Sequence, residues 1–294
     1  MKVVVFDDGG LIGAETALWV RDHGHEVDLV SAPGGLGSLT GEEIAESLRH
    51  CSVVIDLSRQ PSPNTGIITD DHGLVMDEEA LVAAWRRSTS ALLQAETAAG
   101  VEHHVSLSVV GVERIGSEGA FRALQAHETM VQRSGIPYSI VRSTQMFESA
   151  EDIATAGTED WIVWVPPVEV RPVSLTDVAI LLAHTAVSRP LIGVREIAGP
   201  EKFRLDAFVR TALTTVHAEH RHVLTDVRSP FFGARLRPTD LLPGVDAFVA
   251  RTSYREWCAS RPGRESAEWP GGGESPDCAH RPPHGPSDEG CCRE

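Results

Sequence analysis

The sequence predicts an α/β fold, in which a doubly wound parallel sheet is followed by a small C-terminal lobe. Three observations predict it. Apolar, β-branched runs alternate with segments of helical periodicity over residues 2–142, and near-continuous apolar strands are typical of a parallel sheet covered on both faces. A glycine turn joins the first strand to the first helix, and the alternation becomes irregular after Phe147.

The expected elements alternate between strand and helix. We expect strands at 2–6, 25–30, 52–57, 101–110 and 136–142, and helices from 11 to near 24 and at 42–48, 77–99 and 121–133. The strands are rich in Val and Ile, whereas the helices space their apolar residues three and four apart. Right-handed crossovers between successive strands then place helices on both faces of the sheet.

The rest of the chain is expected to form a lobe over the strand ends and then a tail. A strand at 161–165, a helix at 175–186 and a strand at 194–197 fall in this part, so we divide the chain into a core at 1–150, a lobe at 151–257 that is continuous with it, and a disordered tail at 258–294. The tail is rich in Pro, Gly and charged residues and cannot bury enough apolar surface to order itself. Its cysteines and histidines follow no tetrahedral spacing, so no metal site is predicted.

Composition and charge exclude several classes of function. The formal net charge of −16 repels phosphate backbones, so direct nucleic-acid binding is not expected. The apolar run at the start stops at Asp7 and Asp8 and is too short for a signal peptide, and no stretch approaches a membrane span. Of five cysteines, only Cys51 lies well inside the expected fold. We therefore expect a cytoplasmic protein without a disulfide framework.

The turn after the first strand carries the main functional motif. Residues 7–13 read DDGGLIG, in which Gly10 and Gly13 keep the spacing of the second and third glycines of the dinucleotide fingerprint. Those glycines let a pyrophosphate approach the helix N-terminus and let the helix pack closely on the strand. The turn therefore predicts a Rossmann-type core, with cofactor contacts from Gly9, Gly10, Leu11, Ile12 and Gly13.

Asp7 stands where the fingerprint has its first glycine. A carboxylate about 5 Å from a phosphate costs on the order of 3 kcal/mol at an effective dielectric constant near 20, which weakens binding about a hundredfold. Two alternatives are therefore a purely structural turn, and an aspartate that caps the helix and occupies the anion site itself.

The ends of the next strands predict the remaining cofactor contacts. The second strand ends at Ser31, where no acid or arginine follows; because a serine can donate to a 2′-phosphate, NADP is slightly preferred and NAD remains possible. Leu57 and Ser58, at the end of the third strand, and Ser106, in the fourth, are expected to line the same crevice.

Seven short stretches of the chain form a recognisable set: GLIG at 10–13, GHEV at 24–27, VSLSVVG at 105–111, SGIPY at 134–138, IVRSTQ at 140–145, DVA at 177–179 and AGP at 198–200. In these stretches the chain resembles the NmrA-like branch of atypical short-chain dehydrogenases, and the resemblance covers about residues 1–257. The resemblance implies a catalytic serine at Ser108, but Ala120 and Leu124 stand where catalytic relatives carry the tyrosine and the lysine of their proton relay.

Other polar and aromatic residues are candidates for the site. His127, on the same expected helix as Ala120, can act as an acid or a base, or it is a solvated residue of the helix face. His103 and His104 are expected to be packing or surface residues. After the fifth strand, Arg142, Thr144 and Gln145 either contact cofactor or substrate or cap a loop. Three aromatic residues either line the binding site of a flat substrate or simply fill the lobe: Phe147, Trp161 and Trp164.

Three functions follow from these expectations. The resemblance favours a tailoring enzyme that uses NAD(P)H on a small aromatic or quinone-like metabolite of the polyketide type, in antibiotic biosynthesis, by reduction or by reductive coupling of two monomers, with a homodimer possible. Missing Tyr and Lys favour a non-catalytic sensor that binds oxidised dinucleotide and a protein partner. Asp7 favours a cofactor-free isomerase, cyclase or dehydratase on the same scaffold.

Overall fold

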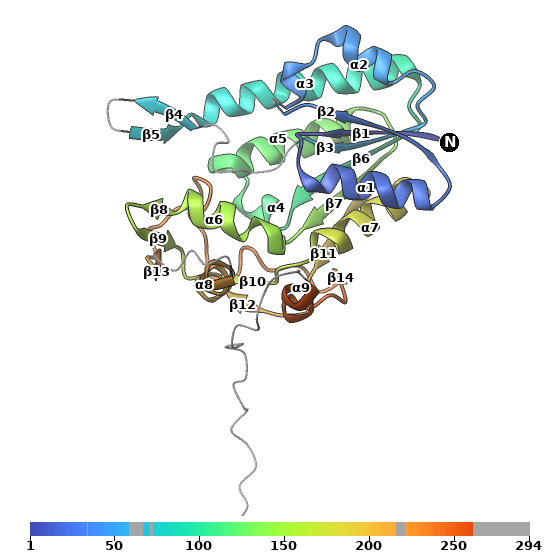
Figure 1. Cartoon of the computed structure of the whole chain (residues 1–294). Helices are drawn as coiled ribbons and strands as arrows, with labels where there is room; N and C mark the ends of the chain where they lie inside the picture. The colour runs from blue at the N-terminus through green and yellow to red at the C-terminus, as the bar shows by residue number, and fades with distance from the viewer. Residues whose placement is uncertain (34, 59–66, 71–72, 216–220, 261–294) are drawn as a thin grey trace, which may run out of the picture.

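A computed structural model describes residues 1–33, 35–58, 67–70, 73–215 and 221–260. Its centre is a seven-stranded sheet with the strand order β14-β11-β7-β6-β3-β1-β2, and each neighbouring pair is parallel. The strands are β1 (Lys2–Asp7), β2 (Glu26–Ser31), β3 (Val53–Leu57), β6 (His103–Val109), β7 (Tyr138–Ser143), β11 (Gly193–Ala198) and β14 (Phe248–Val249). The predicted doubly wound parallel sheet is therefore confirmed (Figure 1).

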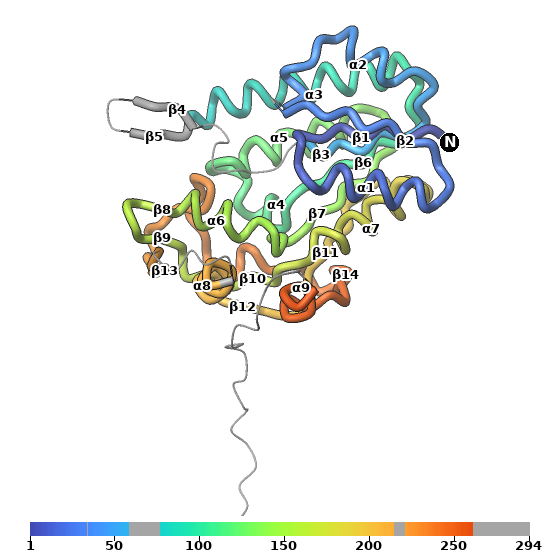
Figure 2. Tube along the Cα trace, viewed as in Figure 1, coloured from blue at the N-terminus to red at the C-terminus, as the bar shows by residue number. Residues whose placement is uncertain are grey.

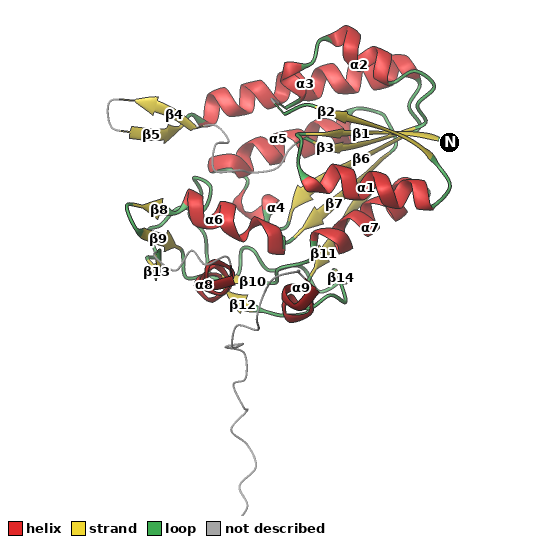
Figure 3. Ribbon diagram, in the orientation of Figure 1, coloured by secondary structure: helices red, strands yellow, loops and turns green. Residues whose placement is uncertain are grey.

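Helices cover both faces of this sheet (Figure 3). One face carries α1 (Leu11–Asp22) and α7 (Leu175–Ala186), and the other carries α2 (Gly41–Ser47), α3 (Glu78–Ala99) and α5 (Gly119–Arg133). Strand β1 shows why two layers form, because alternate side chains enter opposite cores. Val3 and Val5 pack with α1 and α7, whereas Val4 and Phe6 pack under α2 and α3.

The direction of the chain reverses beside β1. From β1 it crosses through α1 to β2 at the sheet edge, and then returns through α2 to β3 on the other side of β1. The carboxyl ends of β1 and β3 therefore flank a topological switch point, where ligands of such sheets bind.

Short elements complete the core and build the lobe. The described chain contains a second, antiparallel pair of strands, β4 (Ile67–Asp70) and β5 (Gly73–Met76), before α3. It also contains the short helix α4 (Val112–Ile115) and the 3-10 turns Leu36–Ser38 and Phe147–Ser149. The lobe contains α6 (Ala150–Ala156), β8 (Thr158–Glu159), β9 (Ile162–Val165), β10 (Glu169–Val170), β12 (Phe203–Arg204), α8 (Leu205–Thr215), β13 (His222–Thr225) and α9 (Tyr254–Ser260). Between β10 and β12 the chain returns to the central sheet as α7 and β11 (Figure 2).

The element boundaries differ from the expected ones by small amounts with local causes. Helix α3 begins one residue late because the Asp77 side chain accepts the N–H of Ala80 as its cap. The tail does not begin at Cys258, since residues 258–260 belong to α9, where Trp257 and Cys258 pack on the apolar core of the lobe. The remainder of the predicted tail lies outside the described residues. Within the described part of the chain, the helices are too short or too polar to cross a bilayer.

Candidate functional site

The glycine turn between β1 and α1 lies at the switch point and is open at its tip. Gly9 has a φ of 93°, a left-handed conformation that favours glycine. Gly9 and Gly10 are exposed, and a Cβ atom on Gly10 would meet only the Asp8 carboxylate, at 3.2 Å. The exposed backbone of Gly9 and Gly10 therefore leaves room at the tip of the turn.

The Asp7 side chain turns back into the same turn. It is 1% exposed, its Oδ2 accepts the N–H of Gly9 at 3.0 Å, and its Cγ lies 2.4 Å from where a Cβ on Gly13 would stand. Burial, and then the neighbouring Asp8, raise the pKa of the Asp7 carboxyl to about 6. Gly13 therefore does allow close packing, and the group that packs against it is the Asp7 side chain.

The predicted cofactor residues at the ends of β2 and β3 differ in their surroundings. Ser31 ends β2, and its Oγ would be 3.7 Å from a Cβ on Gly9. Ser58 follows β3 and donates its N–H (3.0 Å) and its Oγ (2.5 Å) to Oδ1 of Asp56. Leu57 is different, because its side chain is fully buried in the apolar core. Only its main chain can line a site.

A layer of buried polar side chains lies between the sheet and the helices α3 and α5. Ser106 and Ser108 are fully buried on β6, and within the described chain the Oγ of each makes no hydrogen bond. His127 of α5 is also buried, with Nδ1 at 3.1 Å from Oγ1 of Thr89 and Nε2 at 3.9 Å from Oδ2 of Asp56. The reading of His127 as a solvated residue of the helix face is therefore wrong.

Apolar packing surrounds the two positions where the resemblance would place a tyrosine and a lysine. Ala120 and Leu124 are both fully buried. Ala120 packs against Leu81 and Val82 of α3, while Leu124 joins Phe121 and other residues in the lobe-side core. The Ala120 N–H donates to the carbonyl of Phe232, so a loop of the lobe seats directly on this position. No side chain at these two positions can transfer a proton.

A small cavity lies beyond the end of β7. Its volume is about 60 Å³. The lining residues are Val109, Phe121, Ser143, Thr144, Gln145, Met146, Ser149, Asp152, Ile153, Phe231 and Phe232. This volume is well below the roughly 300–1,000 Å³ of pockets that hold small organic ligands, so the cavity can take only a small group of a ligand.

Two of the predicted substrate residues, Thr144 and Gln145, meet in this cavity. The Oγ1 of Thr144 donates to the carbonyl of Arg171 at 2.6 Å, so it also serves to hold a loop. The Oε1 of Gln145 makes no hydrogen bond within the described residues. Gln145 is therefore the polar side chain best placed to meet a ligand there.

The other predicted substrate residues are dispersed. Phe147 lies in the lobe core, against the rings of Tyr254 and Trp257. Trp161 is 70% exposed, so it does not fill the lobe, and Trp164 is half-buried on β9. Arg142 is not available for a ligand as expected, because its guanidinium is engaged by Glu128 and Glu113.

That engagement of Arg142 is specific. Its Nε and Nη2 donate to the two carboxylate oxygens of Glu128, at 2.9 and 2.7 Å, and its Nη1 donates to Glu113 at 2.6 Å. A fork of this kind holds the guanidinium rigidly and neutralises it.

Sequence reasoning missed one group of buried residues. Asp56 lies inside an apolar strand, and His104, expected as packing or surface, is fully buried with Nδ1 at 2.9 Å from Oε1 of Glu96. A charged residue in a strand buried on both faces was the available signal, since such a group needs a partner. His127, the ion-pair partner of Asp56, comes from a helix that is distant in the sequence, whereas Glu96, the partner of His104, is near it in the sequence.

Solved structures share this fold. The chain is similar to the UDP-glucose 4-epimerase of Thermus thermophilus in complex with NAD, at 16% identity over 82% of this chain and 92% of that chain, with a TM-score of 0.57. It is also similar to MoeE5 in complex with UDP-glucuronic acid and NAD, at 18% identity over 89% of this chain and 97% of that chain, with a TM-score of 0.62.

A third similar structure is a new type of NADPH-dependent quinone oxidoreductase from Escherichia coli, at 14% identity over 76% of this chain and 77% of that chain, with a TM-score of 0.52. At these identities the similarity establishes the Rossmann-type fold. No family model and no curated protein matches the sequence.

Proposed function

We propose that this chain is an enzyme that binds a nicotinamide dinucleotide, NADP in preference to NAD, at the switch point and acts on a quinone-like aromatic metabolite. The observation that carries the proposal is the open turn at Gly9 and Gly10, at the place in the sheet where dinucleotides bind. The similar epimerase and MoeE5 structures hold NAD, and the similar oxidoreductase is NADPH-dependent. Ser31 at the rim supports NADP, because a hydroxyl can donate to a 2′-phosphate.

Asp7 sets a condition on this binding. An ionised carboxylate in the turn repels a pyrophosphate, whereas a protonated one does not. Burial has already raised the pKa of Asp7 to about 6, and an approaching phosphate raises it further. The turn fits the cofactor when Asp7 carries a proton, so dinucleotide binding and proton uptake are coupled.

The residues of this chain restrict the substrate. When bound, a reduced nicotinamide supplies a hydride. Ala120 and Leu124 supply no proton, so the acceptor must be electron-poor enough to react without an acid. Gln145, whose Oε1 makes no hydrogen bond within the described residues, can hold a polar group of the substrate at the small cavity beyond β7; Ser108 is fully buried and does not line that cavity. A quinone whose own phenol manages the proton meets these requirements.

The test is a titration of the purified protein with NADPH and with NADP⁺, followed by nicotinamide fluorescence and by the melting temperature. We expect preference for the reduced form, with an affinity that falls roughly a hundredfold between about pH 5 and about pH 8 as Asp7 ionises. Asp7→Asn should bind tightly over the whole range. A wild-type affinity that does not change with pH would contradict the coupling to Asp7.

The same titration distinguishes two other functions. Apolar packing at Ala120 and Leu124 favours a sensor, which would prefer the oxidised dinucleotide and turn over no quinone. The aspartate inside the turn favours a cofactor-free enzyme, which would bind neither dinucleotide at about millimolar concentration, even as Asp7→Asn.

A further inference from the structure

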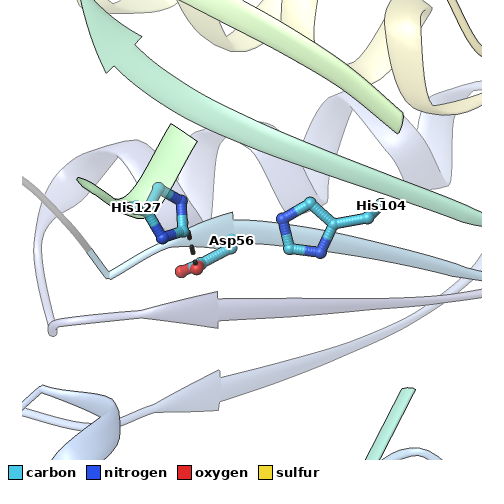
Figure 4. Close-up of side chains that lie close together, drawn as sticks. All are labelled: Asp56, His104 and His127. Carbon is cyan, nitrogen blue, oxygen red and sulfur yellow. Dashed lines mark ion pairs between the residues drawn. The ribbon is translucent and has the colours of Figure 1, made fainter. Parts of the chain in front are cut away.

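Three buried side chains from three elements converge between the sheet and the helices α3 and α5. Asp56 comes from β3, His104 from the neighbouring strand β6, and His127 from α5. One potential metal-ligand atom of each lies within 4.8 Å of the others, and all three side chains are buried. Figure 4 shows the Asp56 carboxylate beside His127, with the imidazole of His104 pointing toward it from the other side.

Strand pairing explains part of this arrangement. In the parallel register Val54 is opposite His104, and Asp56 is opposite Ser106. Alternate residues share a face of the sheet, so Asp56 and His104 both project toward the layer of α3 and α5. His127 reaches the same place from α5, which packs on α3.

Each of the three side chains is oriented by a second group. The Nδ1 of His104 donates to the Glu96 carboxylate, at 2.9 and 3.0 Å from its two oxygens. The Nδ1 of His127 is hydrogen-bonded to Thr89 Oγ1 at 3.1 Å, and Oδ1 of Asp56 accepts twice from Ser58. Metal-binding histidines are typically oriented in this way, with the other ring nitrogen bonded to a carboxylate or hydroxyl.

We propose that Asp56, His104 and His127 bind one divalent transition-metal ion, with Zn²⁺ as the best match. Two imidazoles and one carboxylate are a common Zn²⁺ ligand set in proteins, and three protein ligands leave a position for water or substrate. Bonds of about 2.0–2.2 Å place tetrahedral ligands roughly 3.4 Å apart. The 3.9 Å between His127 Nε2 and Asp56 Oδ2, and separations of up to 4.8 Å within the set, must therefore shorten when the ion binds.

The charges of the layer agree with a cation. Asp56 and Glu96 are both fully buried, and each has a histidine as an ion-pair partner. A dication among them balances two buried carboxylates while the imidazoles stay neutral, which avoids the cost of burying net negative charge. The metal proposal does not rest on dinucleotide binding, so one can fail while the other holds.

The test uses the full chain, stripped with a chelator and then titrated with Zn²⁺ in competition with a chromophoric chelator. We expect one tight site and a higher melting temperature with metal bound. Loss of an outer partner of a metal ligand costs about 10–100-fold in affinity, so Glu96→Gln should fall in that range, and His104→Gln or His127→Gln should lose at least about 100-fold.

His103→Gln is the matched control. His103 adjoins His104 on β6 and is equally buried, but it points to the opposite face and is bonded to Ser139 Oγ at 2.8 Å. It should keep the wild-type affinity. If His104→Gln and His127→Gln bind Zn²⁺ as tightly as His103→Gln does, or if the wild-type protein binds none, the proposal is overturned.

Two further measurements keep the test decisive. The C-terminal segment contains Cys and His residues of its own, so Co²⁺ is also titrated. Thiolate ligation gives a strong charge-transfer absorption that a site of two histidines and one aspartate lacks. Should a variant not fold, ¹⁵N NMR of the histidine rings in the unmodified chain must show two rings shifted by Zn²⁺, and a spectrum without such shifts refutes the site.

Discussion

Asp7→Asn should stabilise the folded protein at neutral pH. The Asp7 side chain is 1% exposed, and its pKa is raised from 3.8 to about 6 by burial and by Asp8. At 1.36 kcal/mol per pKa unit, this difference makes the ionised carboxylate roughly 3 kcal/mol less favourable in the folded than in the unfolded chain. Asparagine keeps the shape and the acceptor for the Gly9 N–H without the charge.

The sign of the pH dependence follows from the raised pKa. Below about pH 4 the carboxyl is protonated in both states, so Asp7 carries no charge penalty and the two proteins should be similarly stable. Between about pH 4 and pH 6 the folded state holds a proton that the unfolded state has released, so wild-type stability falls as the pH rises. Above about pH 6 the full difference of roughly 2–3 kcal/mol in favour of Asp7→Asn should be present.

Urea unfolding followed by circular dichroism, at about pH 4 and about pH 7.5, measures both free energies. Asp22→Asn, at the exposed end of α1, is the control and should change stability by less than about 0.5 kcal/mol at either pH. If Asp7→Asn gives no gain at neutral pH, or the same gain at both, Asp7 is not the buried anion that the structure indicates.

Three other substitutions test separate parts of the site. Gly13→Ala should destabilise the protein by about 1–3 kcal/mol, because the new Cβ would meet the Asp7 side chain at 2.4 Å. In urea unfolding, the double variant with Asp7→Gly should recover most of this loss. Additive effects of the two substitutions would contradict the contact. Gly111 has a φ of 92°, and a Cβ there would lie 2.3 Å from the Asp240 carbonyl oxygen. Gly100 has a φ of 70° with open space around it, so Gly100→Ala should cost only about 1 kcal/mol of backbone strain. Gly111→Ala should therefore lower the unfolding free energy more than Gly100→Ala does. Gln145→Leu should lower quinone turnover while leaving dinucleotide affinity and stability within about 0.5 kcal/mol, since its Oε1 makes no hydrogen bond in the described chain; unchanged turnover would remove Gln145 from the mechanism.

The sheet and its helices were predictable because they depend on local patterns. The apolar runs around Val4 and Val54 and the capped start of α3 at Asp77 are short-range signals, and the structure follows them closely. The end of the lobe was less predictable. Helix α9 is formed because Trp257 and Cys258 find an apolar core built by distant segments, and no local pattern predicts that contact.

The sequence by itself determined the glycine turn, its two aspartates and the apolar residues Ala120 and Leu124. These are matters of residue identity at fixed spacing along one strand and helix. Only the tertiary structure decided that the Asp7 carboxylate folds into the turn, that Arg142 is held by Glu128, and that His127 is buried. The convergence of Asp56, His104 and His127 was decided in the same way. The Asp7 contact depends on how one side chain is oriented within its turn. The other contacts join separate elements, and their geometry is set by strand register and helix packing, which periodicity does not specify.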